Sequence, residues 1–186
     1  MASVFAHAAA AAALGSTVRP TRPIVLTCAA LAVCPDLDVL AFPLGIPYEH
    51  PLGHRGLTHA LAFAALLGPA IAFTAFRRDP QRVRLAVLFA LATASHGILD
   101  AMTTGGLGVG FWIPFTSERF FFPVRPIAVS PIGIEPFFGA RGLAVLANEA
   151  IWVGLPSIAL AGTAWIWRRM RPPARGIETD PGESVE

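Results

Sequence analysis

Four long runs of this 186-residue chain are almost free of charge, and they limit its possible folds more than any other feature. The runs cover residues 24–42, 57–76, 85–101 and 143–167, and a weaker one covers 1–18. Each of the four approaches or exceeds the length of about 20 residues with which a helix crosses a bilayer. Charged residues make up 14% of the chain, against about 25% in soluble domains, which excludes an ordinary soluble fold. The sequence therefore predicts an all-α polytopic membrane bundle of about five spans.

The first apolar run is interpreted as a short span or half-inserted helix that is kept in the mature protein. A signal peptide carries basic residues before its apolar stretch, whereas the first positive charges here, Arg19 and Arg22, come after it. Cys28 and Cys34 lie on one apolar run. They are expected to be small apolar filler rather than part of a disulfide framework.

The arginines predict the orientation, because the chain has no lysine. Ten of the 14 arginines fall into three groups, at 19–22, 77–84 and 168–175. The remaining four lie in the intervening loops and are Arg55, Arg119, Arg125 and Arg141. Five spans place the three groups on one side, which the positive-inside rule makes cytoplasmic. The N-terminus is then expected outside and the C-terminus in the cytoplasm.

The domain organisation follows from these spans. Residues 1–171 are expected to form a single transmembrane domain, with an outer loop at 105–142 that is rich in Phe, Pro and Gly. This loop is either a semi-ordered cap on the outer surface or an irregular connector. Residues 172–186 lack apolar periodicity and become acidic, which is typical of a disordered cytoplasmic tail.

A layer of ionisable residues interrupts the apolar runs. Counted at 1.5 Å per residue from the nearest predicted cytoplasmic arginine, these residues lie about 18–28 Å away, in the outer half of the membrane or at its edge. Ionisable groups are costly in hydrocarbon, so several at one depth predict a shared site. The set comprises His7, Asp36, Asp38, His54, His59, His96, Asp100 and Glu149. His50, beside Glu49 in an outer loop, is instead expected to be a solvated loop residue.

Local spacing indicates that these side chains converge. His96 and Asp100 are four residues apart and share one helix face. Pro35 is expected to break or restart the helix so that both Asp36 and Asp38 turn inward. Thr58 is placed to cap the helix that follows.

Imidazole together with carboxylate ligands is typical of Zn, with Mn or Fe as alternatives. The candidates exceed what one catalytic zinc needs, so one or two ions are expected. The predicted metal ligands are His7, Asp36, Asp38, His54, His59, His96 and Asp100. One of Asp36 and Asp38 is alternatively a residue that orients a ligating histidine. The competing interpretation is a set of intramembrane hydrogen bonds without a metal.

Four segments together resemble a known family. They are PDLD at 35–38, HRGLTH at 54–59, SHGILDAMTTGGLG at 95–108 and RFFFPVRPIAVSPIG at 119–133. The combination resembles the YdjM-like family of LexA-regulated, membrane-bound metal-dependent hydrolases, over His7 to about Glu149. The resemblance implies a multi-pass protein of the bacterial inner membrane with hydrolase activity. The order of the candidate ligands is also similar, more loosely, to that of the zinc-dependent phospholipase C and nuclease group.

These observations give one leading hypothesis, a metal-activated water that attacks a phosphoester of a lipid or lipid-linked substrate at the outer face of the membrane. Arg55 is expected either to clamp the phosphate or to be a loop charge at the headgroup boundary. Asp38 or Glu149, if not a ligand, is expected to act as general base. The expected partners are membrane lipids and the substrate, and not nucleic acid. The alternatives are a non-catalytic metal-binding or transport-related protein and a module whose polar cluster only fixes helix packing.

Overall fold

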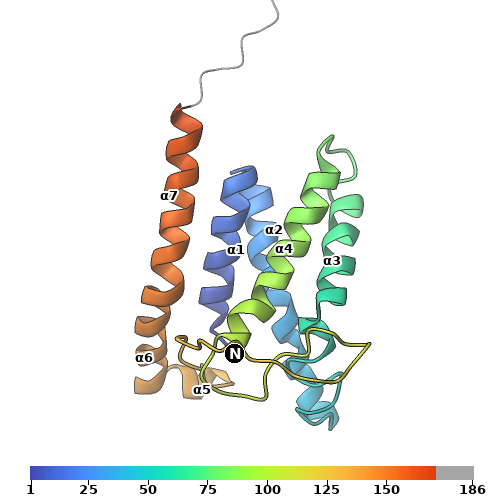
Figure 1. The fold of residues 1–186 in the computed structure, drawn as a ribbon, viewed down its shortest axis with the longest axis vertical. Coiled ribbons are helices and arrows are strands. Elements are labelled where there is room, and N and C mark those ends of the chain that lie inside the picture. Colours follow the sequence, from blue (N-terminus) through green and yellow to red (C-terminus); the bar gives the residue numbers. More distant parts are fainter. Residues whose placement is uncertain (171–186) are drawn as a thin grey trace, which may run out of the picture.

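The computed structural model describes residues 1–170, and this part is all-helical without a β-strand (Figure 1). The predicted tail at 172–186 lies outside the described residues. The helical elements are α1 (Val4–Val18), α2 (Arg22–Val33), η1 (Cys34–Leu44), η2 (Leu57–His59), α3 (Leu61–Thr74), α4 (Arg82–Ala101), α5 (Ile134–Phe137), α6 (Ala140–Glu149), η3 (Ala150–Gly154) and α7 (Leu155–Met170).

Three helical stretches are long and apolar enough to cross a membrane, namely Arg22–Leu44, Arg82–Ala101 and Ala140–Met170. The third comprises α6, η3 and α7 and stands at the edge of the bundle, against α1 (Figure 1). Helices α1 and α3 are apolar but shorter, with 15 and 14 residues. They extend over about 21–22 Å, less than the roughly 30 Å of the hydrocarbon. The five-span topology therefore stays a prediction, as does its orientation.

The described members of the three arginine groups lie on elements that end or begin at one end of the bundle, which is the upper end in Figure 1. Arg19 pairs there with Asp79 of the α3–α4 connection at 2.5 Å, and Arg168 donates a hydrogen bond to the carbonyl of Ser16. The lower end carries the start of α1, the end of α4 and η1. This separation of the two ends agrees with the arginine pattern of the sequence.

Alanines and other apolar side chains fill the contact between α1, α2 and α4. The buried cluster includes Ala11, Ile24, Cys28, Leu31, Ala32, Leu85, Leu88, Phe89 and Ala92. Cys28 is a buried free thiol inside this cluster, as expected for apolar filler. A Cβ at Gly68 of α3 would lie 2.2 Å from the amide nitrogen of Ala90, so glycine allows α3 and α4 to touch along their backbones. Close packing of small residues of this kind stabilises helix association in lipid.

The helix that begins at Arg22 changes its winding at Cys34 and continues as the 3₁₀ segment η1, with Pro35 in its first turn. A 3₁₀ helix has 3.0 residues per turn, so residues two apart are separated by about 120° around its axis instead of about 160° in an α-helix. Asp36 and Asp38 are consequently both buried, with exposed fractions of 6% and 8%. This confirms that both carboxylates turn inward after Pro35.

The segment from residue 102 to residue 133 has no helix and lies across the lower end of the bundle (Figure 1). Backbone hydrogen bonds join Thr104 to Ile127, and Val109 to Phe120. Arg119 donates hydrogen bonds to the carbonyl oxygens of His54 and Tyr48 in the loop before η2. Of the two interpretations of the long loop, these contacts favour an ordered cap. Its last part, predicted as loop to residue 142, contains α5 and the start of α6.

Candidate metal centre

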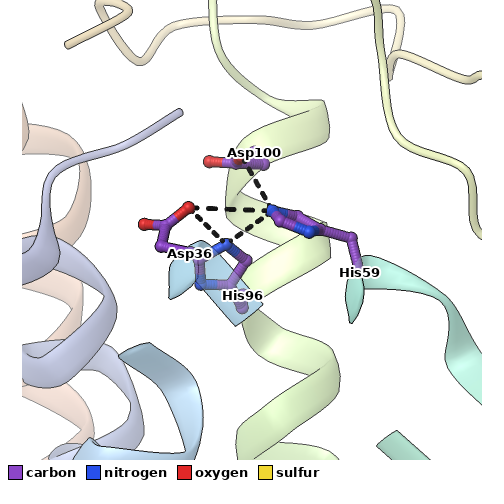
Figure 2. A group of neighbouring side chains, drawn as sticks. All are labelled: Asp36, His59, His96 and Asp100. Carbon is purple, nitrogen blue, oxygen red and sulfur yellow. Dashed lines mark hydrogen bonds and ion pairs between the residues drawn. The ribbon is translucent and has the colours of Figure 1, made fainter. Parts of the chain in front are cut away.

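Four buried side chains point toward one another at the lower end of the bundle (Figure 2). They are Asp36 from η1, His59 from η2, and His96 and Asp100 from α4. One nitrogen or oxygen of each lies within 4.8 Å of the others. The predicted convergence of these four residues, which come from three separate elements, is therefore present in the fold.

The imidazole nitrogens of His59 and His96 meet at the middle of this group. Their Nε2 atoms are 2.9 Å apart. Nε2 of His96 lies 3.3 Å from Oδ1 of Asp36, and Nε2 of His59 lies 3.6 Å from Oδ2 of Asp100. Both oxygens of Asp36 and Oδ2 of Asp100 are buried without a hydrogen-bond partner in the described part of the chain.

The opposite nitrogens of the two rings fix their orientation. Nδ1 of His96 lies 2.6 Å from the carbonyl of Ala32, which only accepts hydrogen bonds, so Nδ1 carries the proton. Nδ1 of His59 faces Oδ2 of Asp38 at 3.2 Å and the hydroxyl of Thr58 at 3.0 Å. In the neutral imidazoles, both lone pairs then lie on Nε2 and face each other.

The donor set fits a divalent metal ion. Two imidazole lone pairs and the two carboxylates, of which only that of Asp100 has a cationic partner in Arg55, repel one another unless a cation or a proton lies between them. Two nitrogen and two oxygen ligands of this kind are suitable for Zn, and also for Mn or Fe. Asp36, His59, His96 and Asp100 would hold such an ion.

Asp38 contacts the Nδ1 atoms of His54 and His59. Its Oδ1 is 2.7 Å from Nδ1 of His54, and its Oδ2 faces Nδ1 of His59. The hydroxyl of Thr58 and the backbone N–H of Arg55 donate to the same carboxylate, at 2.8 Å and 3.1 Å. Of the two aspartates, Asp38 therefore has the environment of the one that orients ligating histidines. Asp38, His54 and His59 also form a second group with metal-ligand spacing.

Thr58 was predicted to cap the following helix, and this prediction is wrong. Helix α3 begins at Leu61, its N-cap is Ala60, and no side chain caps it. The Thr58 hydroxyl instead bonds to the carboxylate of Asp38, because the 3₁₀ turn η2 comes between Thr58 and the helix.

His7 and His54 are the remaining predicted histidine ligands, and both are fully buried. The ring of His7 stacks on that of His96 at 3.7 Å, and its Nε2 lies 3.4 Å from Oδ1 of Asp100. Neither ring nitrogen of His7 has a hydrogen bond in the described residues, nor has Nε2 of His54. Both rings therefore lie beside the four-residue group with nitrogens that make no hydrogen bond in the described residues. His50 is exposed, as predicted.

Arg55 is fully buried and lies inside the centre, so it is not a surface loop charge. Its Nε is 2.9 Å from Oδ2 of Asp100. Its other nitrogens donate hydrogen bonds to the carbonyl of Gly105 and the hydroxyl of Thr103. The backbone at Arg55 has a positive φ of 63°, an uncommon conformation for a residue with a side chain. The guanidinium thus joins α4 and the long loop around Asp100.

Glu149 is buried at the end of α6, just before the π-helical turn η3. Its carboxylate accepts hydrogen bonds from the backbone N–H and the hydroxyl of Ser3. The neighbouring backbone N–H, of Ala2, donates to Oδ1 of Asp100 at 2.7 Å. Glu149 therefore contacts the segment that precedes α1, and this segment contacts the four-residue group.

Several residues of the centre have no signature in the sequence. The carbonyl of Ala32 is one, because any residue supplies a backbone oxygen. Ser3 and Thr103 are ordinary polar residues at the ends of apolar runs. Tyr48 also has no signature in the sequence, although its ring packs edge-on against His54. Burial raises the pKa of the Tyr48 phenol.

Apolar helices around a buried centre of histidines and aspartates define a membrane protein with a candidate metal site. The profile of the YdjM inner membrane protein family matches residues 1–171, and the chain belongs to this family. It is 38% identical over 175 residues to the inner membrane protein YbcI of Escherichia coli (strain K12), covering 91% of this chain and 99% of that protein. No solved structure matches. The predicted family and the inner-membrane location are thereby confirmed.

Proposed function

We propose that the chain is a membrane-bound hydrolase that depends on a divalent metal ion, most simply Zn, and cleaves a phosphoester of a lipid or lipid-linked substrate. The observation that carries the proposal is the meeting of two imidazole Nε2 atoms with the carboxylate of Asp36, which has no hydrogen-bond partner in the described residues, and that of Asp100, which is paired with Arg55. A divalent ion held there supplies Lewis-acid activation of water and of the phosphoryl group. Regulation by LexA stays a prediction of the family resemblance.

Asp38 and Arg55 are assigned to positioning other residues of the centre. Asp38 holds the rings of His54 and His59 in place through their Nδ1 atoms. Arg55 fixes the carboxylate of Asp100, which lies 2.9 Å from its Nε. Arg55 thus has its partners inside the protein, so we assign it to positioning and not to clamping the phosphate.

His54 is our candidate for the proton acceptor. Its Nδ1 faces Asp38, which leaves the lone pair on Nε2, and that atom is buried without a hydrogen bond in the described residues. A histidine held by a carboxylate in this way is a common general base. The carboxylates of Asp38 and Glu149, which the sequence offered for this role, already accept hydrogen bonds from protein groups. If a second ion binds, His54 would be a ligand instead.

The lipid character of the substrate is supported by the surroundings of the centre. Element η1 provides Asp36 and Asp38, and another face of it exposes Leu37 and Leu40 by 59% and 64%. In an inner membrane protein, such side chains contact lipid. A substrate that already lies in the bilayer therefore reaches the centre without leaving it.

Metal analysis of purified protein, with turnover of phospholipids and of a soluble phosphodiester measured in parallel, tests the proposal. His96→Ala removes a predicted ligand and is expected to lose both metal and turnover. His50→Ala is the matched control, because His50 is an exposed histidine of a nearby loop, and it should retain both. Metal retained in a His59→Ala, His96→Ala double variant would contradict the metal site. Metal binding without turnover of any phosphoester would leave the alternative of a non-catalytic metal-binding protein.

A further inference from the structure

A cavity of about 310 Å³ lies next to the metal centre, between the start of α1, η1 and the segment 130–138. Val4 and Phe5 line it from α1, Val39 from η1 and Phe137 from α5. Its volume is within the range of pockets that bind small ligands, which begins at about 300 Å³. None of the residues proposed above to bind metal or transfer a proton lines it.

The lining of the cavity suits a hydrocarbon and not a phosphate. No side chain that lines it is ionisable. Its two serines, Ser3 and Ser130, are buried, and their hydroxyls already donate to Glu149 and to the carbonyl of Pro131. A charged headgroup placed there would lose its water and find no cationic side chain, which is costly. An apolar chain gains free energy from the same surface.

The rim of the cavity consists of large exposed apolar side chains. Phe5, Ile132 and Phe138 line it and are exposed by 62%, 45% and 79%. Exposed apolar side chains that gather around a pocket mark a contact with membrane or ligand. Because the protein lies in the inner membrane, these side chains place the opening of the cavity toward the acyl chains of the bilayer.

The cavity and the metal centre are neighbours, with the segment 1–3 in contact with both. Met1 and Ser3 line the cavity, while the N–H of Ala2 between them donates to Asp100. The cavity and the centre are therefore close enough for one molecule with an apolar chain and a polar end to occupy both. The apolar cavity suits the hydrocarbon chain of an amphiphile, and the metal centre suits its polar end.

We propose that this cavity binds the hydrocarbon chain of the substrate while its phosphoester lies at the metal centre. The proposal rests on the proposed function and narrows its substrate to phosphoesters that carry a long acyl or prenyl chain. Soluble phosphoesters then lack half of the binding surface and are poor substrates.

Photo-crosslinking tests the cavity without relying on activity. The probe is a phosphatidylglycerol with a diazirine at the end of one acyl chain, mixed into vesicles that contain the full-length protein. Crosslinks are expected in residues 1–5 and 130–138, measured against those on the outward face of α7. Val39→Trp fills the cavity and is expected to lower them by about ten-fold, the factor lost when about two buried methylene groups are excluded.

Matched variants keep this test decisive. Leu40→Trp makes a similar change on the exposed face of the same element, outside the cavity, and should leave the crosslinks unchanged. Ile132→Trp fills the cavity from the loop and gives a second filling variant if Val39→Trp does not fold. Crosslinks at residues 1–5 and 130–138 that are equal in wild type and in the folded filling variants would overturn the proposal.

Turnover separates this proposal from the proposed function. A long-chain phospholipid and a soluble phosphodiester are compared in wild type and Val39→Trp. We expect KM for the long-chain lipid to rise by about ten-fold and turnover of the soluble ester to stay unchanged. Crosslinks that are lost in Val39→Trp, with no turnover by wild type, would support the cavity and contradict the hydrolase. Turnover of both esters that is unaffected by the filling variants would contradict the cavity alone.

Discussion

The apolar contact of α1, α2 and α4 and the polar lower end of the bundle differ in how their buried atoms are paired. Around Phe89, at the contact of α1, α2 and α4, apolar side chains fill the space and their backbones are bonded within helices. At the lower end, the buried side-chain atoms without hydrogen bonds in the described part of the chain all belong to His7, Asp36, His54, Arg55 and Asp100. Unpaired polar atoms are costly in a bilayer. The apolar part is thus complete with protein atoms alone, whereas the polar end has buried groups that a metal ion could bind.

The comparison predicts where substitutions act. Those at the polar end should change metal affinity, and those in the apolar part should change stability only. Three variants, ordered by their expected effect on metal affinity, examine this division.

Asp100→Ala should have the largest effect. It removes a predicted ligand and leaves the guanidinium of Arg55 buried without its carboxylate. Loss of one partner of a buried ion pair costs about 3–5 kcal/mol of stability. Metal binding should fall below detection in calorimetric titration, and the unfolding temperature should fall as well. Normal metal affinity in this variant would show that Asp100 is not a metal ligand.

Asp38→Asn should have an intermediate effect. It keeps the size of the side chain but weakens its hold on the Nδ1 atoms of His54 and His59. Replacement of a residue that orients metal ligands lowers affinity by about 10–100-fold. The same titration measures this loss. If Asp38 is itself a ligand, the loss should instead equal that of Asp100→Ala.

Phe89→Ala should leave metal affinity unchanged. Phe89 is fully buried in the apolar cluster, and its truncation costs about 3 kcal/mol of stability. Thermal unfolding should report this cost, while the folded protein binds metal as wild type does. A lowered metal affinity of the folded variant would show that the two parts are coupled and would break the comparison.

The sequence predicted which segments are helical better than it predicted where each helix begins and ends. Long apolar runs show where helices lie, because a bilayer leaves few other structures possible. The depth of the ionisable residues predicted their meeting, since helical rise is constant. Pro35 indicated the change at η1. The role of Thr58 was missed, because the short 3₁₀ turn η2 separates it from α3 and a capping pattern in sequence does not reveal such a turn.

Other parts of the centre depend on long-range contacts that no local pattern predicts. The carbonyl of Ala32 reaches His96 across 64 positions of sequence, and Ser3 reaches Glu149 across 146. For Arg55 the sequence allowed two roles, a phosphate clamp and a loop charge. Its burial became evident only in the fold, because Asp100, Thr103 and Gly105 approach it from α4 and the loop that follows.

The hydrogen bonds of Ser3 to Glu149 bear on how the protein is made. A ribosome makes Ser3 at the beginning and Glu149 of α6 near the end, so Ser3 waits for its partner through most of synthesis. During that interval the acids of η1 and α4 already lie in the membrane without the finished enclosure around them. The four candidate ligands are all present once α4 is made, but the contact that holds the N-terminal segment beside them forms only after α6 is made.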